Sequence, residues 1–359
     1  MQQIKKRYKA LDGLRGVAAL MVIFYHYSLP FFDPIGVFSD NFFVKTSYAF
    51  VDLFFVLSGF VIAANYVDSI TDWNDLKQYL IKRFARLYPL LLFTVLIYMA
   101  LKGYALYAGF SFDAPDYGWS DYFIDIIEPL SFLNSTPLIS TQAGMNPPSW
   151  SISAEMIAYV LFGLVILGFK GKRTPFIFFI IASISFILFK GRFMFASDFG
   201  FVRGVLGFSL GVIAYDLVSR KKEFDTRVHE WIFLLLLVVI FYGIHRSSTE
   251  LTNLLLCPLY FYGIIVFSKE EGSLSKLLTG RIFQFLGKIS YSVYLMHFII
   301  LWCFYQLAWN VLGLEPSLFM GYAGISLVLL IVVIISHFTY LWIELPGMKL
   351  LRKGLNKND

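Results

Sequence analysis

Charged residues are scarce in this sequence, because Asp, Glu, Lys and Arg make up only 15% of its 359 residues. Hydrophobic residues account for 58% and aromatic residues for 19%. A soluble protein of this length needs many more polar side chains to cover its surface. The composition therefore excludes an ordinary soluble protein and predicts an all-α, polytopic membrane protein.

Cysteine is nearly absent as well, and this limits two kinds of chemistry. Cys257 and Cys303 both fall inside predicted membrane segments, so no disulfide framework is implied. No cluster of side chains has metal-ligand spacing, and we expect neither a metal nor a permanently bound cofactor. The net charge of +6 calls for no nucleic-acid partner, because loops at the membrane lipid surface explain it.

Long apolar runs are abundant. Ten of them have the length of about 17 to 25 residues that spans a hydrocarbon core. They are 11–29, 48–66, 88–108, 150–169, 174–190, 200–219, 231–246, 251–267, 289–308 and 319–343.

The basic residues test this count, since Lys and Arg collect in short cytoplasmic loops. With the amino terminus inside, most of the 30 basic residues are cytoplasmic. They are Lys5, Lys6, Arg7, Lys9, Lys77, Lys82, Arg83, Arg86, Lys170, Lys172, Arg173, Arg220, Lys221, Lys222, Arg227, Lys269, Lys276, Arg281, Lys288, Lys349, Arg352, Lys353 and Lys357. We therefore expect about ten transmembrane helices with both termini in the cytoplasm.

The chain is expected to form one transmembrane domain over residues 1–359, with no appended soluble domain. Its cytoplasmic tails are residues 1–10 and about 344–359. The longest connection, about residues 109–149, carries acidic residues but no Lys or Arg, so it is placed outside and expected to fold over the bundle. Its acidic residues are Asp113, Asp116, Asp121, Asp125 and Glu128.

Two polar residues stand out in the first apolar run. Arg15 lies near its cytoplasmic end, and His26 follows eleven residues later, about 16 Å along a helix axis and close to three whole turns. Both side chains are therefore expected on nearly one face, as an anion-binding group and a general base along one path. The alternative is that Arg15 reaches lipid headgroups and His26 is a hydrogen-bonding group inside the bundle.

Several motifs occur in the same order as in a known family. They are LDGLRGVAALMVIFYH with Arg15 and His26 in an R-x10-H spacing, FFVLSG at Phe54 to Gly59, RFARLYP at Arg83 to Pro89, WSISAE at Trp150 to Glu155, GKISYSVYLMH at Gly287 to His297, and WIELP around Glu344. The chain thereby resembles the acyltransferase-3 family of bacterial membrane O-acyltransferases, which includes polysaccharide O-acetyltransferases. The resemblance extends over nearly the whole chain.

This resemblance implies an acyl donor from the cytoplasm, acetyl-CoA or another acyl-CoA, and a glycan or lipid-linked glycan acceptor outside. Arg83 and Arg86, with Arg15, would bind the phosphates of the donor, because guanidinium groups suit phosphate oxygens. Tyr88 completes their motif. The alternative for Arg83 and Arg86 is ordinary positive-inside charge.

Glu155 is expected at about the same outer depth as His26, where the two side chains would meet. A carboxylate that accepts a hydrogen bond from one imidazole nitrogen fixes the tautomer and leaves the other nitrogen as a base. His26 would then act on the acceptor hydroxyl as a general base, or carry the acyl group transiently. The alternative for Glu155 is a structural acid favoured by the helix dipole.

Other residues are expected to support this site. The FFVLSG segment is expected to form a tunnel wall, in which Ser58 can hydrogen-bond and Gly59 lets helices or a narrow ligand approach closely. Trp150 and Ser151 of the WSISAE motif are expected to support the site. Asp12 is expected to pair with Arg15, and His297 to face the same cavity. Arg203, buried in the sixth run, requires a carboxylate partner, with Asp198 and Glu155 as candidates.

The predicted function is transfer of an acyl group, most simply acetyl, to a hydroxyl of an envelope glycan such as lipopolysaccharide O-antigen or exopolysaccharide. The predicted location is the bacterial inner membrane. The rival class is a secondary transporter that uses Arg15, His26 and Glu155 as a proton and anion path. A transporter predicts inverted repeats with broken helices in matching positions, and the hydropathy pattern has neither.

Overall fold

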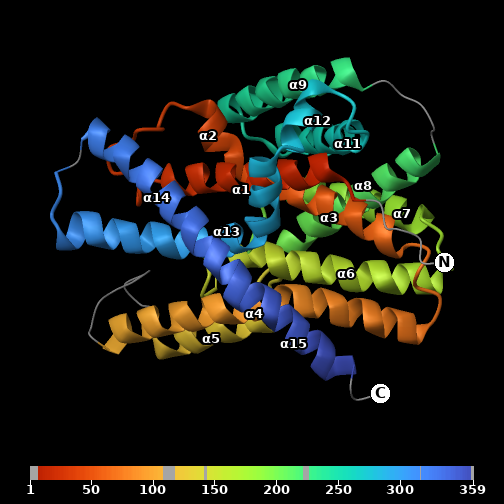
Figure 1. The fold of residues 1–359 in the computed structure, drawn as a ribbon, viewed down its shortest axis with the longest axis horizontal. Coiled ribbons are helices and arrows are strands. Elements are labelled where there is room, and N and C mark those ends of the chain that lie inside the picture. Colours follow the sequence, from red (N-terminus) through yellow and green to blue (C-terminus); the bar gives the residue numbers. More distant parts are fainter. Residues whose placement is uncertain (1–6, 108–117, 141–143, 221–225, 316, 357–359) are drawn as a thin grey trace.

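The computed structural model describes residues 7–107, 118–140, 144–220, 226–315 and 317–356. Within these ranges every regular element is a helix, which confirms the all-α prediction (Figure 1). Several residues of the sequence analysis lie outside the described ranges, namely Lys5, Lys6, Asp113, Asp116, Lys221, Lys222 and Lys357.

Eight helices in the described part of the chain are long and apolar enough to cross a membrane. They are Phe42–Tyr66, Trp73–Tyr104, Pro147–Gly168, Gly200–Arg220, Arg227–Arg246, Glu250–Phe267, Arg281–Val311 and Leu318–Leu355. The two other predicted spans are also helical, as α1 (Lys9–Tyr27) and α7 (Thr174–Lys190). The chain is therefore a polytopic membrane protein. The count of ten spans and the cytoplasmic termini stay predictions.

The remaining elements complete the bundle. They are α2 (Phe42–Thr46), η1 (Ser47–Ala49), α3 (Phe50–Tyr66), α4 (Trp73–Tyr107), α5 (Trp119–Leu130), η2 (Pro147–Ser149), α6 (Trp150–Gly168), α8 (Gly200–Arg220), α9 (Arg227–Arg246), α10 (Glu250–Leu254), α11 (Leu256–Phe267), α12 (Ser273–Leu278), α13 (Arg281–Tyr305), the π-helical turn η3 (Gln306–Val311), α14 (Leu318–Thr339), the π-helical turn η4 (Tyr340–Glu344) and α15 (Leu345–Asn356).

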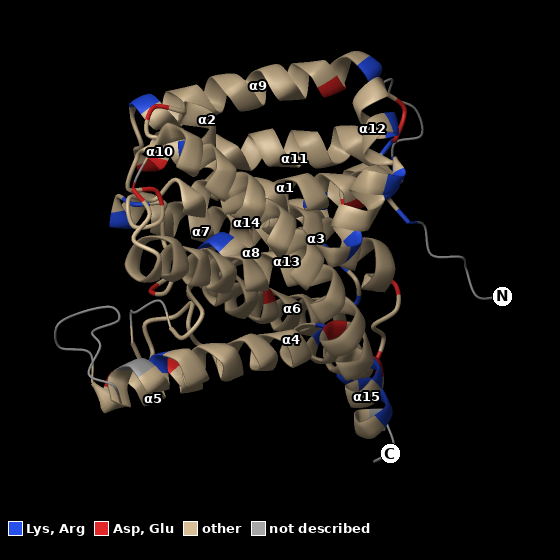
Figure 2. Cartoon of the chain, turned by 60° about the vertical axis from the view of Figure 1, so that its left-hand side comes forward, with Lys and Arg blue, Asp and Glu red and all other residues tan. Residues whose placement is uncertain are grey.

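Most of the long helices run roughly along one direction, while α14 and α15 cross the others diagonally (Figure 1). The start of α1 and the end of α15 lie at the same end of the bundle (Figure 1). Figure 2 shows that most Lys, Arg, Asp and Glu residues gather at the two ends of the helices, with long uncharged stretches between them. This distribution suits a bundle whose middle lies in hydrocarbon.

Glycine allows the closest helix contacts. A Cβ atom on Gly59 of α3 would lie 2.0 Å from the carbonyl oxygen of Phe208 on α8, and one on Gly211 of α8 would lie 2.1 Å from that of Val56. Helices in membranes pack closely where small residues let their backbones approach. The motif glycine at position 59 is therefore required for the α3–α8 contact, in line with the expectation that it permits close approach.

Two elements differ from the sequence prediction. The helix α4 begins at Trp73, well before the predicted boundary at residue 88, so Arg83 and Arg86 lie inside a helix. The predicted external connection contains α5, which lies beside α4 (Figure 1). The Tyr122 hydroxyl donates to the Met99 carbonyl at 2.9 Å, and Lys102 and Asp125, both buried, form an ion pair at 3.5 Å.

The last helices join through η4, and a proline accounts for the irregular turn. Pro346 has no backbone N–H, and its ring conflicts with the carbonyl four residues earlier in a regular helix. A π-helical turn is one way to accommodate such a break. The turn carries Glu344, whose residue is only 1% exposed, into the bundle.

Candidate active site

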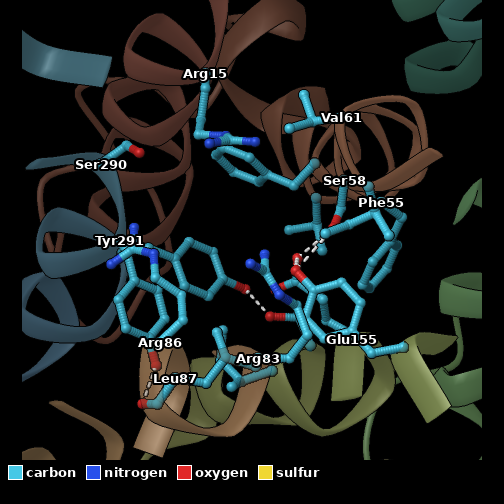
Figure 3. Close-up of a pocket in the computed structure, with 17 residues that line it drawn as sticks. Arg15, Phe55, Ser58, Val61, Arg83, Arg86, Leu87, Glu155, Ser290 and Tyr291 are labelled. Carbon is cyan, nitrogen blue, oxygen red and sulfur yellow. Dashed lines mark hydrogen bonds between the residues drawn. The ribbon is translucent and has the colours of Figure 1, made fainter. Parts of the chain in front are cut away.

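A cavity of about 150 Å³ lies inside the bundle, and four charged residues line it. Arg15 comes from α1, Arg83 and Arg86 from α4, and Glu155 from α6 (Figure 3). The structure thus brings together the three arginines that the sequence analysis assigned to the donor. Three cations at one cavity inside an apolar bundle form a site suited to an anion.

The three arginines differ in their hydrogen-bond and ion-pair partners. The Arg86 guanidinium forms an ion pair with Glu344, which also accepts a hydrogen bond from the Ser292 hydroxyl at 2.7 Å. Arg83 donates to the Tyr66 hydroxyl at 3.0 Å, and its guanidinium lies 5.0 Å from the centre of that ring. Among the described residues, neither Arg83 nor Arg15 forms an ion pair with a carboxylate.

Glu155 lies in this cavity and not against His26. Its carboxylate accepts hydrogen bonds from the hydroxyls of Ser58 and Tyr159 (Figure 3). His26 and Glu155 are both described, and no hydrogen bond joins them. The predicted contact is therefore wrong, because a similar depth in the membrane does not set the direction in which each helix turns its side chains.

His26 instead faces His297 of α13. The Nε2 atom of His297 lies 3.1 Å from the Nδ1 atom of His26, and the ring centres are 4.9 Å apart. His26 Nδ1 also lies 3.0 Å from the Val22 carbonyl oxygen. His26 is half-buried, whereas His297 is fully buried.

The histidine pair adjoins the cavity through Tyr294. This tyrosine lines the cavity, and its ring centre lies 5.8 Å from that of His297. Its hydroxyl hydrogen-bonds to the Ser151 hydroxyl at 2.8 Å, so Ser151 also belongs to this wall. His297 therefore does not line the cavity that it was expected to face, but lies behind one of its wall residues.

Two predicted ion pairs are replaced by others. Asp12 pairs with Arg7 at 2.7 Å and not with Arg15, which points toward the cavity. Arg203 pairs with Asp52 of α3 through two hydrogen bonds of 2.8 and 3.1 Å.

Neither carboxylate proposed for Arg203 is its partner, because Asp198 pairs with Arg192 and Glu155 lies in the cavity. The signal for the true partner was present in the sequence, since Asp52 is a carboxylate within a predicted span. A buried charge of this kind requires an opposite one.

Of the other supporting residues, some line the cavity and others pack elsewhere in the bundle. Ser58 lines the cavity, as expected. The Trp150 ring lies 5.0 Å from the Arg203 guanidinium, and the Tyr88 ring stacks on Phe84 at 4.5 Å. Trp150 and Tyr88 do not line the cavity, and their rings instead pack on Arg203 and Phe84.

Comparison with known proteins identifies the class of this site. A family described as acyltransferase domain matches residues 8–337, nearly the whole chain. The chain therefore belongs to the acyltransferase-3 family, and it is a membrane acyltransferase. No solved structure matches it.

Individual relatives agree with the family. Over 96% of its length the chain is 26% identical to "Acyltransferase MdmB" from Streptomyces mycarofaciens, of which the match covers 92%. It is 24% identical over 98% of its length to "Putative O-acetyltransferase SACOL0978" of Staphylococcus aureus (strain COL), covering 59% of that protein. A quarter of the chain, 25%, is 40% identical to "Protein 2 in picA locus" of Rhizobium radiobacter, covering 42% of it. The chain thus spans less than two thirds of the second and third of these relatives.

Proposed function

We propose that this protein transfers an acyl group, most simply acetyl, from cytoplasmic acyl-CoA to a hydroxyl of an extracytoplasmic glycan. The bacterial cytoplasmic membrane is the proposed location. The observation that carries the proposal is the cavity, where Arg15, Arg83 and Arg86 converge from two helices. Its wall residue Tyr294 also packs against His297, the ring that contacts His26. Guanidinium groups that lack carboxylate partners are suited to phosphate.

In the proposed reaction, Arg83 and Arg15 bind donor phosphates at the cavity while the thioester reaches past Tyr294 toward His26. Tyr294 supports this route because it both lines the cavity and packs against the histidine pair. Holding the thioester beside a base lowers the barrier by removing the entropy cost of bringing them together. The carboxylate of Glu155 takes no proton-transfer step in this scheme, since it lies against Ser58.

His26 acts in one of two ways. As a general base it takes the proton of the acceptor hydroxyl, whose oxygen attacks the thioester carbonyl carbon. The carbon–sulfur bond breaks, and the sulfur leaves with the proton returned by His26. As an acyl carrier, His26 first attacks the thioester carbonyl carbon, and the carbon–sulfur bond breaks to release the thiolate. The acceptor oxygen then takes the acyl group from His26, and its proton goes to the thiolate. Both routes yield one ester and one free thiol.

The test compares envelope glycans of cells that lack the gene with those of complemented cells, by mass spectrometry. We expect one mass increment, that of a single acyl group, to disappear from a glycan on deletion and to return on complementation. Its size identifies the acyl group, and the fragment that carries it identifies the acceptor. Identical glycan masses in both strains, with the protein shown to be produced, would contradict a glycan acceptor.

A further inference from the structure

A second histidine, His297, contacts His26, the proposed reactive residue. The fully buried His297 contacts His26 through ring nitrogens 3.1 Å apart, and its own Nδ1 lies 2.7 Å from the Tyr294 carbonyl oxygen. Glu155, the partner that the sequence predicted for His26, lies in the cavity instead. The buried ring of His297 therefore occupies the partner position beside the more accessible ring of His26.

The contact follows from how α1 and α13 pack. A Cβ atom on Gly16 would lie 2.6 Å from the backbone nitrogen of Gly287, so the two helices approach closely there. His26 and His297 each lie ten residues further along their helices, about 15 Å at the helical rise. The helices therefore run in parallel and in register, and the backbone contact at the glycines fixes the position of the histidines.

The hydrogen bonds define which nitrogens carry protons. A carbonyl oxygen can only accept, so His297 Nδ1 must donate to the Tyr294 carbonyl. In a neutral ring this leaves His297 Nε2 as an acceptor. His26 Nδ1 lies 3.0 Å from the Val22 carbonyl oxygen and 3.1 Å from His297 Nε2. Both of these atoms are acceptors, so His26 Nδ1 must carry the proton that is donated to them. His26 Nε2 is then left with a free lone pair.

The reverse arrangement leaves groups unsatisfied. Were the His26 proton on Nε2, the lone pair of Nδ1 would face the lone pair of the Val22 carbonyl oxygen. Each unmade hydrogen bond at a buried group costs about 1 to 3 kcal/mol. Among the described residues, neither ring pairs with a carboxylate, so the pair is oriented by neutral acceptors alone.

We propose that His297 is a positioning residue for acyl transfer, which holds His26 in the tautomer with Nε2 free and stabilises the cation that forms on His26. This inference rests on the proposed function, in which His26 is the base or the acyl carrier. In either route His26 gains a bond at Nε2 and becomes positively charged, and its Nδ1–H then donates more strongly to His297 Nε2. His297 itself exchanges no proton.

The variants His297→Gln and His297→Asn separate this role from packing. The Gln side chain places its amide oxygen about where Nε2 lies, and so can accept from His26. The shorter Asn side chain reaches about the position of Nδ1, and keeps only the donor to Tyr294. We expect Gln to retain at least about a third of the wild-type kcat and Asn to lose about 10- to 150-fold, the factor of one hydrogen bond to a charged group.

The assay uses inside-out membrane vesicles with labelled acetyl-CoA, at equal amounts of folded protein. The KM for acetyl-CoA should stay within about twofold in both variants, because the arginine cavity is untouched. A His297→Asn protein with wild-type kcat would overturn the inference. So would a His297→Gln protein as slow as the Asn protein.

A second measurement needs no His297 variant. The chain has five histidines, and the ¹⁵N shifts of ring nitrogens distinguish the two neutral tautomers. In labelled wild-type protein, the His26 signal, identified by its loss in His26→Gln, should show a proton on Nδ1. A proton on Nε2 alone would overturn the inference.

The failure of this inference differs from the failure of the proposed function. The His26→Gln substitution removes the proposed base. If that protein were still active, both the proposed function and the positioning role would be contradicted. An inactive His26→Gln protein beside a fully active His297→Asn protein leaves the proposed function intact and removes only the positioning role.

Discussion

At the scale of single residues, an arginine inside an apolar bundle needs a partner or a ligand. Arg86 and Arg203 have carboxylate partners, Glu344 and Asp52. Arg83 lines the cavity with only aromatic and hydroxyl contacts among the described residues. The cavity arginines therefore divide into one that is already neutralised and others whose charge is available to an anion.

This division predicts that substitutions of Arg83 and Arg86 weaken acyl-CoA binding to different extents. Arg83→Gln should weaken acyl-CoA binding by about 10- to 150-fold, the cost of one charge-assisted hydrogen bond. Arg86→Gln should weaken binding less, because Glu344 already offsets its charge. Binding of labelled acetyl-CoA to purified protein in detergent measures both, and equal losses would contradict the division.

Arg86→Gln should instead lower stability. It leaves the buried Glu344 carboxylate without its cation, which costs up to about 3 kcal/mol in a partly exposed pair. The double variant Arg86→Gln with Glu344→Gln is the matched control, since it removes both charges and should recover much of the loss. Thermal unfolding midpoints of the single and double variants provide the comparison.

The sequence predicts how deep a side chain lies, but not which helix faces it. Arg15, Arg83 and Arg86 were expected together because the family resemblance assigned all three to the donor phosphates on the cytoplasmic side, and they do line one cavity. His26 and Glu155 were matched by their depth in the membrane alone, and they do not meet. The rotation of a helix about its axis depends on how all its neighbours pack.

At the scale of helices, every predicted apolar run contains a helix in the described part of the chain, because a span in lipid must satisfy its backbone hydrogen bonds internally. The missed elements α5 and α12 are short, and η4 is an irregular turn at Pro346. Such elements depend on neighbouring packing and not on a long apolar run. The carboxylate of Glu344 was unassigned for this reason.

The α3–α8 contact gives a prediction at this scale. Gly59→Ala places a Cβ atom 2.0 Å from the Phe208 carbonyl oxygen, so the helices must separate. Overpacking of this kind costs about 1 to 3 kcal/mol. Gly243→Ala on α9 is the matched control, because no heavy atom lies within 4 Å of its Cβ position.

The expected result is a lower unfolding midpoint for Gly59→Ala in detergent and an unchanged or slightly higher one for Gly243→Ala, since Ala favours a helix over Gly. Equal midpoints for the two variants would show that the contact is loose in solution. Separation of α3 from α8 should also disturb the cavity wall, because Ser58, next to Gly59, lines the cavity.

At the scale of the whole molecule, one bundle contains both the proposed donor site and the proposed reactive histidine. The cavity holds the arginines, and Tyr294 separates it from the pair formed by His26 and His297. The start of α1 and the end of α15 lie at one end of the bundle (Figure 1). With the predicted cytoplasmic termini, an acyl group would pass from that side toward His26 near the opposite end of α1.

The most direct test of this account is transfer of labelled acetyl from acetyl-CoA to glycan in inside-out vesicles that contain wild-type or His26→Gln protein. Gln keeps a polar side chain of similar size but no basic nitrogen. General acid–base steps contribute about 100- to 10,000-fold, so transfer should fall to about 1% or less while acetyl-CoA binding and the unfolding midpoint stay unchanged. A well-folded His26→Gln protein that retained more than about a tenth of wild-type transfer would contradict the assignment of His26.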